Sequence, residues 1–226
     1  MTTRGPRLVL LGKQGAGKGT QATRLADHYG VVDVATGDLF RAAAREGTTF
    51  GLEAQRYMEK GELVPDEITV GVVEEILGRD QTVKRGFVLD GFPRTVRQAE
   101  ELERVLGEDP LDLVIDLDAP TEIVVRRIAG RRVCVNCGAT YHVDAPPKKN
   151  WTCDVCGSEV LQRDDDTEEA VMRRLELYEI RTLPLIQFYR RKGTLAHVDG
   201  TGESDDVFQA LLSTVDDRIA ADGAPS

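Results

Sequence analysis

A glycine-rich run near the start of the chain has the residue types and spacing of a phosphate-binding loop. The run Gly12–Lys18, GKQGAGK, fits the pattern G-x-x-x-x-G-K and is followed by Gly19 and Thr20. Glycines let backbone N–H groups turn inward around phosphate oxygens, and the lysine can reach the terminal phosphates. A plain glycine-rich turn between a strand and a helix explains the glycines but not the lysine. The loop therefore predicts a site for nucleotide phosphates.

The four cysteines form two C-x₂-C pairs, Cys134 with Cys137 and Cys153 with Cys156, fifteen residues apart. Two such pairs can place four thiolates around one tetrahedral Zn²⁺ ion. The protein then fills every coordination position, so the predicted zinc site is structural rather than catalytic. Fe²⁺ suits the same ligands. Two disulfides or free thiols are the alternatives, which a cytoplasmic location disfavours.

The elements that must position these residues alternate between strand and helix. Short apolar runs predict buried strands at 7–11, 31–35, 86–90, 111–117 and 195–198. The segments between them have helical periodicity, which predicts an α/β fold with a central parallel β-sheet flanked by helices on both faces. The glycine loop lies between the first strand and a helix, as a phosphate loop requires.

Residues 131–166 interrupt this alternation. They hold all four cysteines and the only tryptophan, and no helical period fits them, so we expect an inserted subdomain. A long helix is expected from Thr167 to about Lys192, started by Asp166 in a capping box and kinked at Pro184. Thr36 is expected to be the N-cap of an earlier helix that ends near Arg45.

Composition excludes several classes of protein. The chain has 226 residues, of which 41% are hydrophobic and 30% charged, as in a globular protein that needs no disulfides to fold. The 29 basic and 39 acidic residues give a net charge of −10, which disfavours a nucleic-acid partner. No apolar run approaches the ~20 residues of a membrane span, and the first seven residues lack the apolar core of a secretory signal. We therefore expect a cytoplasmic protein, a monomer, with no membrane or nucleic-acid partner.

Six longer motifs, spread over nearly the whole chain, resemble adenylate kinases of the long-lid bacterial form. They are GAGKGTQ (15–21), ATGDLFR (35–41), DGFPRTVRQAE (90–100), RIAGRR (127–132), RDDD (163–166) and VDGTG (198–202). The GKGT sequence, with glycine before the threonine, is similar to nucleoside monophosphate kinases rather than to GTPases or motor ATPases. The resemblance implies the P-loop nucleoside monophosphate kinase fold and the reaction ATP + AMP ⇌ 2 ADP, with Mg²⁺ bound with the nucleotide.

The resemblance also implies three regions. The core comprises residues 1–35, 65–129 and 167–226. An AMP-binding insert spans residues 36–64. The lid spans residues 130–166 and carries the predicted zinc site. Closure of both inserts over the nucleotides would exclude water, a competing acceptor.

By the same resemblance, cations surround the transferred phosphoryl group. No general base is needed, because the acceptor phosphate is already ionised near neutral pH. The residues expected to act in catalysis are Lys18, Arg94, Arg131, Arg163, Arg174 and Asp90. Asp90 is expected to hold Mg²⁺ through water, with a turn cap as the alternative. For each arginine the alternative is a solvated surface charge. Asp165 and Asp166 resemble lid carboxylates that pair with arginines, or else form an exposed helix start.

Two sets of binding residues follow from the motifs. The expected ATP site comprises Gly15, Ala16, Gly17, Lys18, Gly19, Thr20, Arg127, Arg131, Thr140, Tyr141 and Gly202. The expected AMP site comprises Thr36, Arg41, Glu62, Leu63, Val64, Gly91, Phe92, Pro93, Arg94, Gln98, Arg163 and Arg174. The amide of Gln98 offers a donor and an acceptor, which suits adenine. Tyr141 could instead pack within the lid.

One departure and two competing functions remain. Lys13 and Gln14 replace the proline-containing pair common in this family's loop; Lys13 is either a cation near the phosphates or solvated, and a loop without proline is expected to be softer. A related kinase with another acceptor, or with GTP as donor, is one alternative function, although Gln98 favours AMP. A zinc-ribbon binding module with a degenerate nucleotide fold is the other; the acidic charge and the intact Lys18, Arg41 and Arg94 argue against it.

Overall fold

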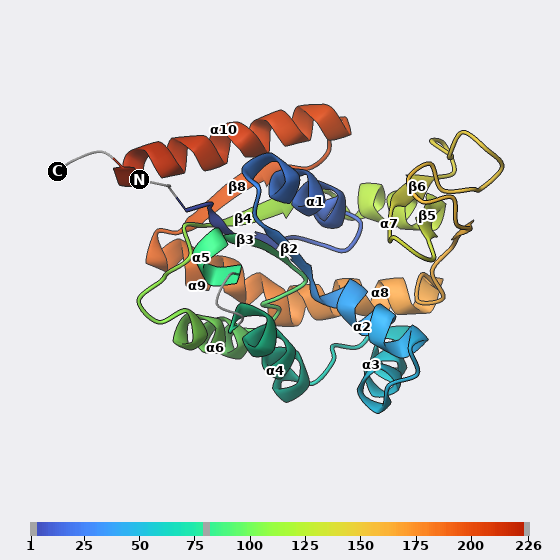
Figure 1. Cartoon of the computed structure of the whole chain (residues 1–226), viewed down its shortest axis with the longest axis horizontal. Coiled ribbons are helices and arrows are strands. Elements are labelled where there is room, and N and C mark those ends of the chain that lie inside the picture. Colours follow the sequence, from blue (N-terminus) through green and yellow to red (C-terminus); the bar gives the residue numbers. More distant parts are fainter. Residues whose placement is uncertain (1–3, 79–81, 224–226) are drawn as a thin grey trace.

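The computed structural model describes residues 4–78 and 82–223, so the first three residues of the segment read for a secretory signal lie outside it (Figure 1). Within these ranges, five parallel strands form one sheet in the order β2-β3-β1-β4-β8. The strands are β1 (Arg7–Leu11), β2 (Val32–Ala35), β3 (Phe87–Asp90), β4 (Leu113–Asp118) and β8 (Leu195–Asp199). The predicted α/β fold with a central parallel sheet is confirmed.

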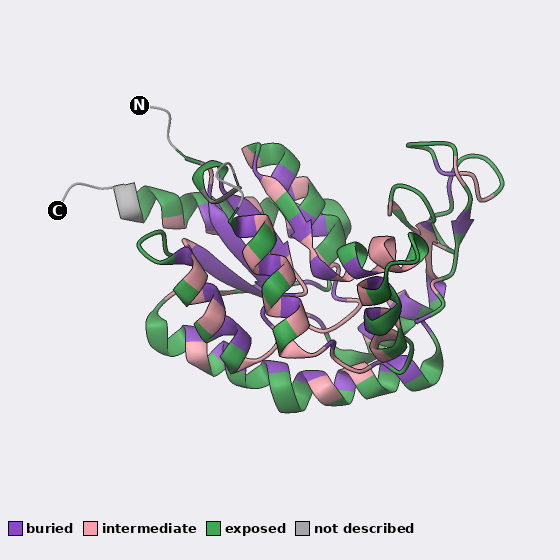
Figure 2. Ribbon diagram, turned by 60° about the horizontal axis from the view of Figure 1, so that its bottom comes forward, coloured by how far each residue is buried: buried purple, intermediate pink, exposed green. Residues whose placement is uncertain are grey.

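The sheet is buried because apolar side chains leave both of its faces, as expected for parallel strands covered by helices. Leu8 and Leu10 of β1 belong to the cluster that includes residues of α1, α7, α8 and α10, whereas Val9 and Leu11 belong to the cluster with residues of α4, α6 and α9. Figure 2 shows the buried strands in purple between helices with exposed outer faces. The first group of helices comprises α1 (Lys18–Tyr29), α7 (Thr121–Gly130), α8 (Glu168–Leu177) and α10 (Ser204–Gly223). The second comprises α4 (Asp66–Leu77), α6 (Val96–Leu106) and α9 (Leu183–Lys192), and the short α5 (Thr82–Arg85) precedes β3.

Two further helices after β2 form a small cluster of their own. Helices α2 (Thr36–Arg45) and α3 (Thr49–Glu59) pack around Phe40, Ala54 and Val64. Their approach is so close that a Cβ on Gly51 would lie 2.1 Å from the carbonyl carbon of Ala43. The predicted N-cap at Thr36 is wrong. Ala35 is the capping residue, and the Thr36 hydroxyl, inside the helix, instead donates to the backbone oxygen of Asp90 at 3.4 Å.

The cysteine-containing segment folds around a small antiparallel sheet in the order β6-β5-β7. Its strands are β5 (Arg131–Cys134), β6 (Thr140–His142) and β7 (Val160–Leu161). The buried cluster of this segment contains Cys134, Cys153 and Val160 with Ala139, Tyr141 and Trp151 packed against them. With so few apolar residues inside, this sheet depends on something other than hydrophobic burial for stability.

The predicted long helix is divided in two. Helix α8 is followed by a π-helical turn, η1 (Tyr178–Thr182), and then by α9, in whose first turn Pro184 lies. Because proline has no N–H to donate, it is tolerated in the first turn of α9, directly after the π turn that interrupts the predicted helix. The predicted cap at Asp166 is also wrong: Thr167 caps α8 by accepting from the Ala170 N–H at 3.2 Å, while the Asp166 carboxylate bonds Arg131.

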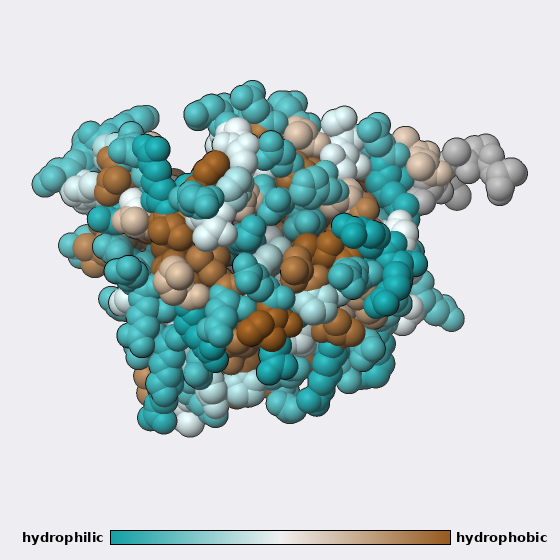
Figure 3. Space-filling view, turned by 180° about the vertical axis from the view of Figure 1, so that it is seen from behind, coloured by the Kyte–Doolittle hydropathy of each residue, from teal (hydrophilic) through white to brown (hydrophobic). Residues whose placement is uncertain are grey.

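Seen from behind, hydrophobic patches lie among a largely hydrophilic surface (Figure 3). None of the described helices combines the length and apolar character needed to span a membrane.

Candidate active site

The glycine run forms the turn between β1 and α1. Gly12, Gly15 and Gly17 have φ angles of 139°, 84° and 104°, which favour glycine. A Cβ on Gly12 would also lie 2.3 Å from the Leu117 backbone oxygen, so the close approach of β4 requires glycine there. These glycines therefore allow a tight loop just before α1. The N-terminus of this helix carries partial positive charge, which favours binding of a phosphate.

Lys18 is the first residue of α1, and its ammonium group lies inside this loop. Nζ donates to the backbone oxygens of Gly12 at 2.8 Å and Lys13 at 2.9 Å. The pKa of Lys18 is lowered to about 8, chiefly by burial; Asp90 opposes this shift, while Arg94 and Arg131 contribute to it. A buried cation beside two further cations makes this a place where an anion is stabilised.

Asp90 ends β3 at the same edge of the sheet. A Cβ on Gly19 would lie 3.3 Å from Asp90 Oδ2, so the carboxylate faces the beginning of α1, where Gly19 leaves space. The carboxylate also acts electrostatically on both Lys18 and Arg94. A hard oxygen ligand beside a phosphate-binding turn fits a hydrated Mg²⁺ ion, which takes few protein ligands.

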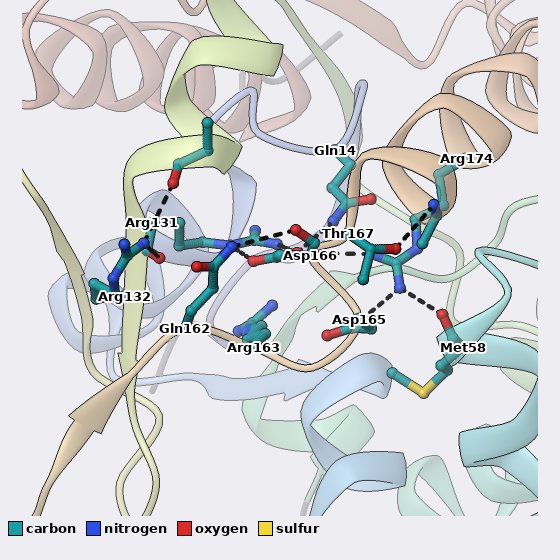
Figure 4. Close-up of polar contacts among 12 residues, drawn as sticks. Gln14, Met58, Arg131, Arg132, Gln162, Arg163, Asp165, Asp166, Thr167 and Arg174 are labelled. Carbon is teal, nitrogen blue, oxygen red and sulfur yellow. Dashed lines mark hydrogen bonds and ion pairs between the residues drawn. The ribbon is translucent and has the colours of Figure 1, made fainter.

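Four arginines from separate parts of the chain pair with three carboxylates, those of Asp38, Asp165 and Asp166, and a fifth, Arg94, lies within electrostatic reach. Figure 4 shows Arg131, Arg163 and Arg174 with Asp165 and Asp166. The arginines are Arg41, Arg94, Arg131, Arg163 and Arg174. Burial lowers the pKa of Arg94, and Arg174 and Arg41 add to this effect. They are thus a partly desolvated cluster of like charge and not isolated surface arginines.

The carboxylates hold these arginines in place. Arg174 Nη2 donates to Asp165 Oδ2 at 2.5 Å and to the Met58 backbone oxygen at 2.7 Å, while Arg131 Nε donates to Asp166 Oδ2 at 2.8 Å. Burial opposes ionisation of Asp165, but Arg174 and its neighbouring arginines keep the pKa of this carboxyl below its usual value. The carboxylates of Asp165 and Asp166 are 10% and 0% exposed, so the alternative of an exposed helix start is wrong.

Arg163 has the least complete set of partners. Its Nη2 lies 3.4 Å from Asp38 Oδ1, and its Nε is buried without a hydrogen-bond partner among the described residues. Burial, with Arg41 and Arg131 nearby, lowers the pKa of Arg163 to about 10. A buried donor of this kind is ready to bind an incoming anion.

The predicted AMP-side residues surround this cluster. The turn Gly91–Pro93 follows Asp90 directly, and Arg94 Nε donates to the Gly91 oxygen at 2.9 Å. Gln98 is buried; its Nε2 donates to Asp66 Oδ1 at 2.6 Å and its Oε1 accepts from the Arg94 N–H at 2.7 Å. Among the described residues each end of this amide makes one hydrogen bond, so each keeps one further hydrogen-bonding position.

The remaining AMP-side residues, Glu62, Leu63 and Val64, connect α3 to α4. Val64 is buried in the small cluster with Phe40, whereas Glu62 and Leu63 are half-buried.

On the ATP side, Arg127 of α7 lies against the turn after β8. Its Nη1 donates to the Gly200 oxygen at 2.8 Å, and its Nη2 lies 3.4 Å from the Gly202 oxygen. The structure thus brings together two residues that the motifs placed in one site. Tyr141 is different, because its hydroxyl donates to Cys153 Sγ at 3.4 Å and accepts from the Asp154 N–H at 2.8 Å, as the lid-packing alternative expects. Its neighbour Thr140 is exposed.

The four cysteines meet in one cluster, with all sulfurs within 4.8 Å of one another. Zinc–sulfur bonds of about 2.3 Å in a tetrahedron put the sulfurs about 3.8 Å apart, so the cluster fits this ion. Gly138 and Gly157 follow the two pairs with φ angles of 76° and 75°, forming the same turn twice. Ser158, through its N–H and side chain, lowers the pKa of Cys156 to about 5, which favours the thiolate that a metal binds. All four cysteines are free, so the disulfide alternative is not supported.

Comparison with known proteins decides the family. The family model described as adenylate kinase matches residues 10–194. The chain is 51% identical over 207 residues to an adenylate kinase of Methanosarcina acetivorans, covering 90% of this chain and 95% of that one. It is 52% identical over 204 residues to the adenylate kinase of Bacillus subtilis, covering 89% of this chain and 94% of that one. The chain belongs to the adenylate kinase family.

Sequence reasoning missed two residues that contact the candidate site. Asp38 bonds Arg41 at 2.5 Å as well as Arg163, and Asp66 orients Gln98; neither was assigned a role. Asp38 lies inside a motif and could have been found, but Asp66 meets Gln98 only through the packing of α4 on α6. The Lys13 side chain is partly exposed, and its Nζ donates to the Ala119 oxygen at 3.0 Å and lies 3.3 Å from Asp118 Oδ1.

Proposed function

We propose that this chain transfers the terminal phosphoryl group of ATP to AMP, reversibly, to form two ADP molecules. The observation that carries the proposal is the partly buried cluster of Lys18 and five arginines around the phosphate loop. Phosphoryl transfer depends chiefly on positioning and on neutralisation of negative charge, which such a cluster supplies. The name shared by its relatives agrees with this chemistry.

The roles divide between two sides of the site. The loop N–H groups and Lys18 would bind the donor phosphates, and Arg41 and Arg94 the phosphate of AMP. Arg131, Arg163 and Arg174 would lie over the phosphoryl group in transit. Asp90 would hold Mg²⁺ through water, and the ion supplies further neutralisation of the donor phosphates. The acceptor oxygen is ionised at neutral pH, so no side chain has to remove a proton.

The two inserts are proposed to close around this centre. Residues 36–64 would cover AMP, and the lid, residues 130–166, would cover ATP while the remaining residues form the core. Closure brings the arginines of separate segments together and excludes water. Zn²⁺ on the four cysteines would hold the lid folded without taking part in the reaction. We further propose a cytoplasmic monomer with no nucleic-acid or membrane partner.

AMP is the proposed acceptor because Gln98 keeps a free donor and a free acceptor position beside Arg94. An amide matched to adenine discriminates strongly against a base that leaves it unpaired. The test is initial ADP formation with ATP and each of AMP, UMP, CMP and GMP at equal concentration. AMP should exceed the others by at least about a hundredfold. Equal rates with UMP or CMP would contradict the assignment, and a donor series with ATP and GTP tests the other nucleotide.

The binding-module alternative predicts no turnover at all. A buried cationic cluster at a phosphate loop is costly for a module that only binds through its zinc ribbon. Purified protein that binds ATP but forms no ADP with AMP and Mg²⁺ would favour that alternative.

A further inference from the structure

The residue that departs from the family's loop pattern, Gln14, makes a contact with the arginine cluster. Its Nε2 donates to Asp166 Oδ1 at 3.3 Å (Figure 4). Asp166 also accepts from Arg131 Nε at 2.8 Å and lies 3.8 Å from Arg174 Nη1. The carboxylate, with no exposed surface, therefore joins the phosphate loop to two arginines.

The orientation of the Gln14 amide is set by this carboxylate. An ionised carboxylate only accepts hydrogen bonds, so the amide must present its NH₂ group. As a result, Gln14 Oε1 is buried with no hydrogen-bond partner among the described residues. An unsatisfied acceptor is unfavourable, and the bond to Asp166 is the polar contact that holds the side chain in this orientation.

The backbone that carries Gln14 is held firmly. The ammonium group of its neighbour Lys13 donates to the Ala119 oxygen at 3.0 Å and pairs with Asp118. Asp118 is the last residue of β4, and Ala119 follows it. Gly12 on the other side of Lys13 packs against the Leu117 oxygen. The backbone of Gln14 is therefore anchored to β4 of the core, and its side chain contacts the carboxylate of Asp166 at the end of the lid.

We propose that Gln14 is a positioning residue for Arg131. By holding the Asp166 carboxylate against the phosphate loop, it fixes the guanidinium of Arg131, which bonds the same carboxylate. Without the amide, Asp166 and Arg131 move as a pair with the lid, and fewer closures place Arg131 correctly. This proposal rests on the role in phosphoryl transfer proposed above for Arg131.

The chain contains a matched control. Gln162 also donates through its Nε2 to Asp166 at 3.3 Å, but to the backbone oxygen and not to the carboxylate. Gln14→Ala and Gln162→Ala therefore each delete one side-chain amide that donates to Asp166. Only the first deletion should release the carboxylate that bonds Arg131.

The first experiment compares steady-state kinetics of the two variants with the wild type in the full-length protein with Mg²⁺. Gln14→Ala should lower kcat about tenfold with both KM values within about twofold, because misplacement affects the reacting geometry more than binding. Gln162→Ala should remain within about twofold of the wild type. Equal losses in both variants, or a change in KM alone, would overturn the proposal.

A second variant guards against a folding effect. Gln14→Glu keeps the side-chain length but puts a carboxylate beside Asp166. The new carboxylate cannot donate to Asp166 and is repelled by it, so kcat should fall at least as far as in Gln14→Ala while the circular dichroism melt stays close to that of the wild type. A Gln14→Glu enzyme with wild-type kcat would contradict the proposed hydrogen bond.

The double variant separates this proposal from the proposed function. Arg131→Ala alone should reduce kcat strongly, and adding Gln14→Ala should cause less than about a twofold further loss, since the two residues act through one contact. Independent, multiplicative losses would overturn the positioning role alone. Near-normal turnover by Arg131→Ala would overturn the catalytic role of Arg131 and this proposal with it.

Discussion

The cysteine cluster of the lid and the arginine cluster at the phosphate loop both bring four or more chemically similar groups together, but they differ in what balances them. Four of the five arginines bond carboxylates of the same chain, those of Asp38, Asp165 and Asp166. The four sulfurs lie within 4.8 Å of one another and could hold a metal ion. The arginine site is thus balanced by the protein's own charges, whereas we propose that a metal ion balances the cysteine site. Changes to the first should therefore affect rate, and changes to the second stability.

The largest effect should come from removing the cation inside the phosphate loop. Lys18→Ala should lower kcat about a thousandfold or more, because a charge fixed at the transferring phosphoryl group is lost. Lys192→Ala is a suitable control, since Lys192 is 43% exposed and pairs with Glu103 away from the loop. Coupled assays and circular dichroism melts measure rate and fold together. A Lys18→Ala enzyme with more than a tenth of normal activity would contradict the catalytic role of the cationic cluster.

Metal removal should lower the thermal stability of the lid more than it lowers kcat. A strong chelator, or Cys134→Ser, should unfold the lid at a lower temperature than the core, because structural zinc contributes about 10–16 kcal/mol in small zinc domains. Calorimetry and metal analysis should find about one zinc per native chain. Val155→Ser between the last two cysteines is a control, being 75% exposed. Well under one metal per chain, with a melting temperature insensitive to chelator, would contradict the structural role.

A smaller effect should follow from weakening one carboxylate of the arginine cluster. Asp38→Asn weakens the bonds to Arg41 and Arg163 and should lower kcat/KM about tenfold, consistent with loss of charge-assisted hydrogen bonds. Asp205→Asn is the matched control, because Asp205 also pairs with an arginine, Arg24, but is 88% exposed. Steady-state kinetics with AMP varied is the measurement. Indistinguishable kinetics for the two variants would show that preassembly by Asp38 is unimportant.

A pH dependence of stability is the last predicted effect. The folded-state pKa of Lys18 is lowered to about 8 from 10.5. Below pH 8 both folded and unfolded chains hold this proton, and between pH 8 and 10.5 mainly the unfolded chain does. The free energy of unfolding should therefore rise across this window, by roughly 3 kcal/mol. Urea melts at pH 7 and pH 10 give the free energy of unfolding of the wild type and of Lys18→Met, and the difference between the two proteins isolates the contribution of Lys18. A difference that does not change with pH would contradict the lowered pKa of Lys18.

The same contrast explains what could be predicted from the sequence. The glycine loop and the cysteine pairs could be predicted, because residues close together in the sequence are expected to bind the same ligand. The fold followed from alternating strands and helices. The resemblance predicted that Asp166 pairs with arginines, and its bond to Arg131 confirms this. The contact with Gln14 could not be predicted, because Asp166 is more than a hundred residues from the loop and meets it only after folding. The wrong caps at Thr36 and Asp166 have one cause: each side chain has a long-range hydrogen-bond partner, which local propensity does not include.

The most direct test of the whole account is the stoichiometry of the reaction catalysed by the purified protein. With ATP, AMP and Mg²⁺, phosphorus NMR should show two ADP molecules formed for each AMP consumed, and the same equilibrium when the reaction starts from ADP. Unconverted ATP and AMP, or ADP formed at the same rate without AMP, would contradict direct phosphoryl transfer between two nucleotides.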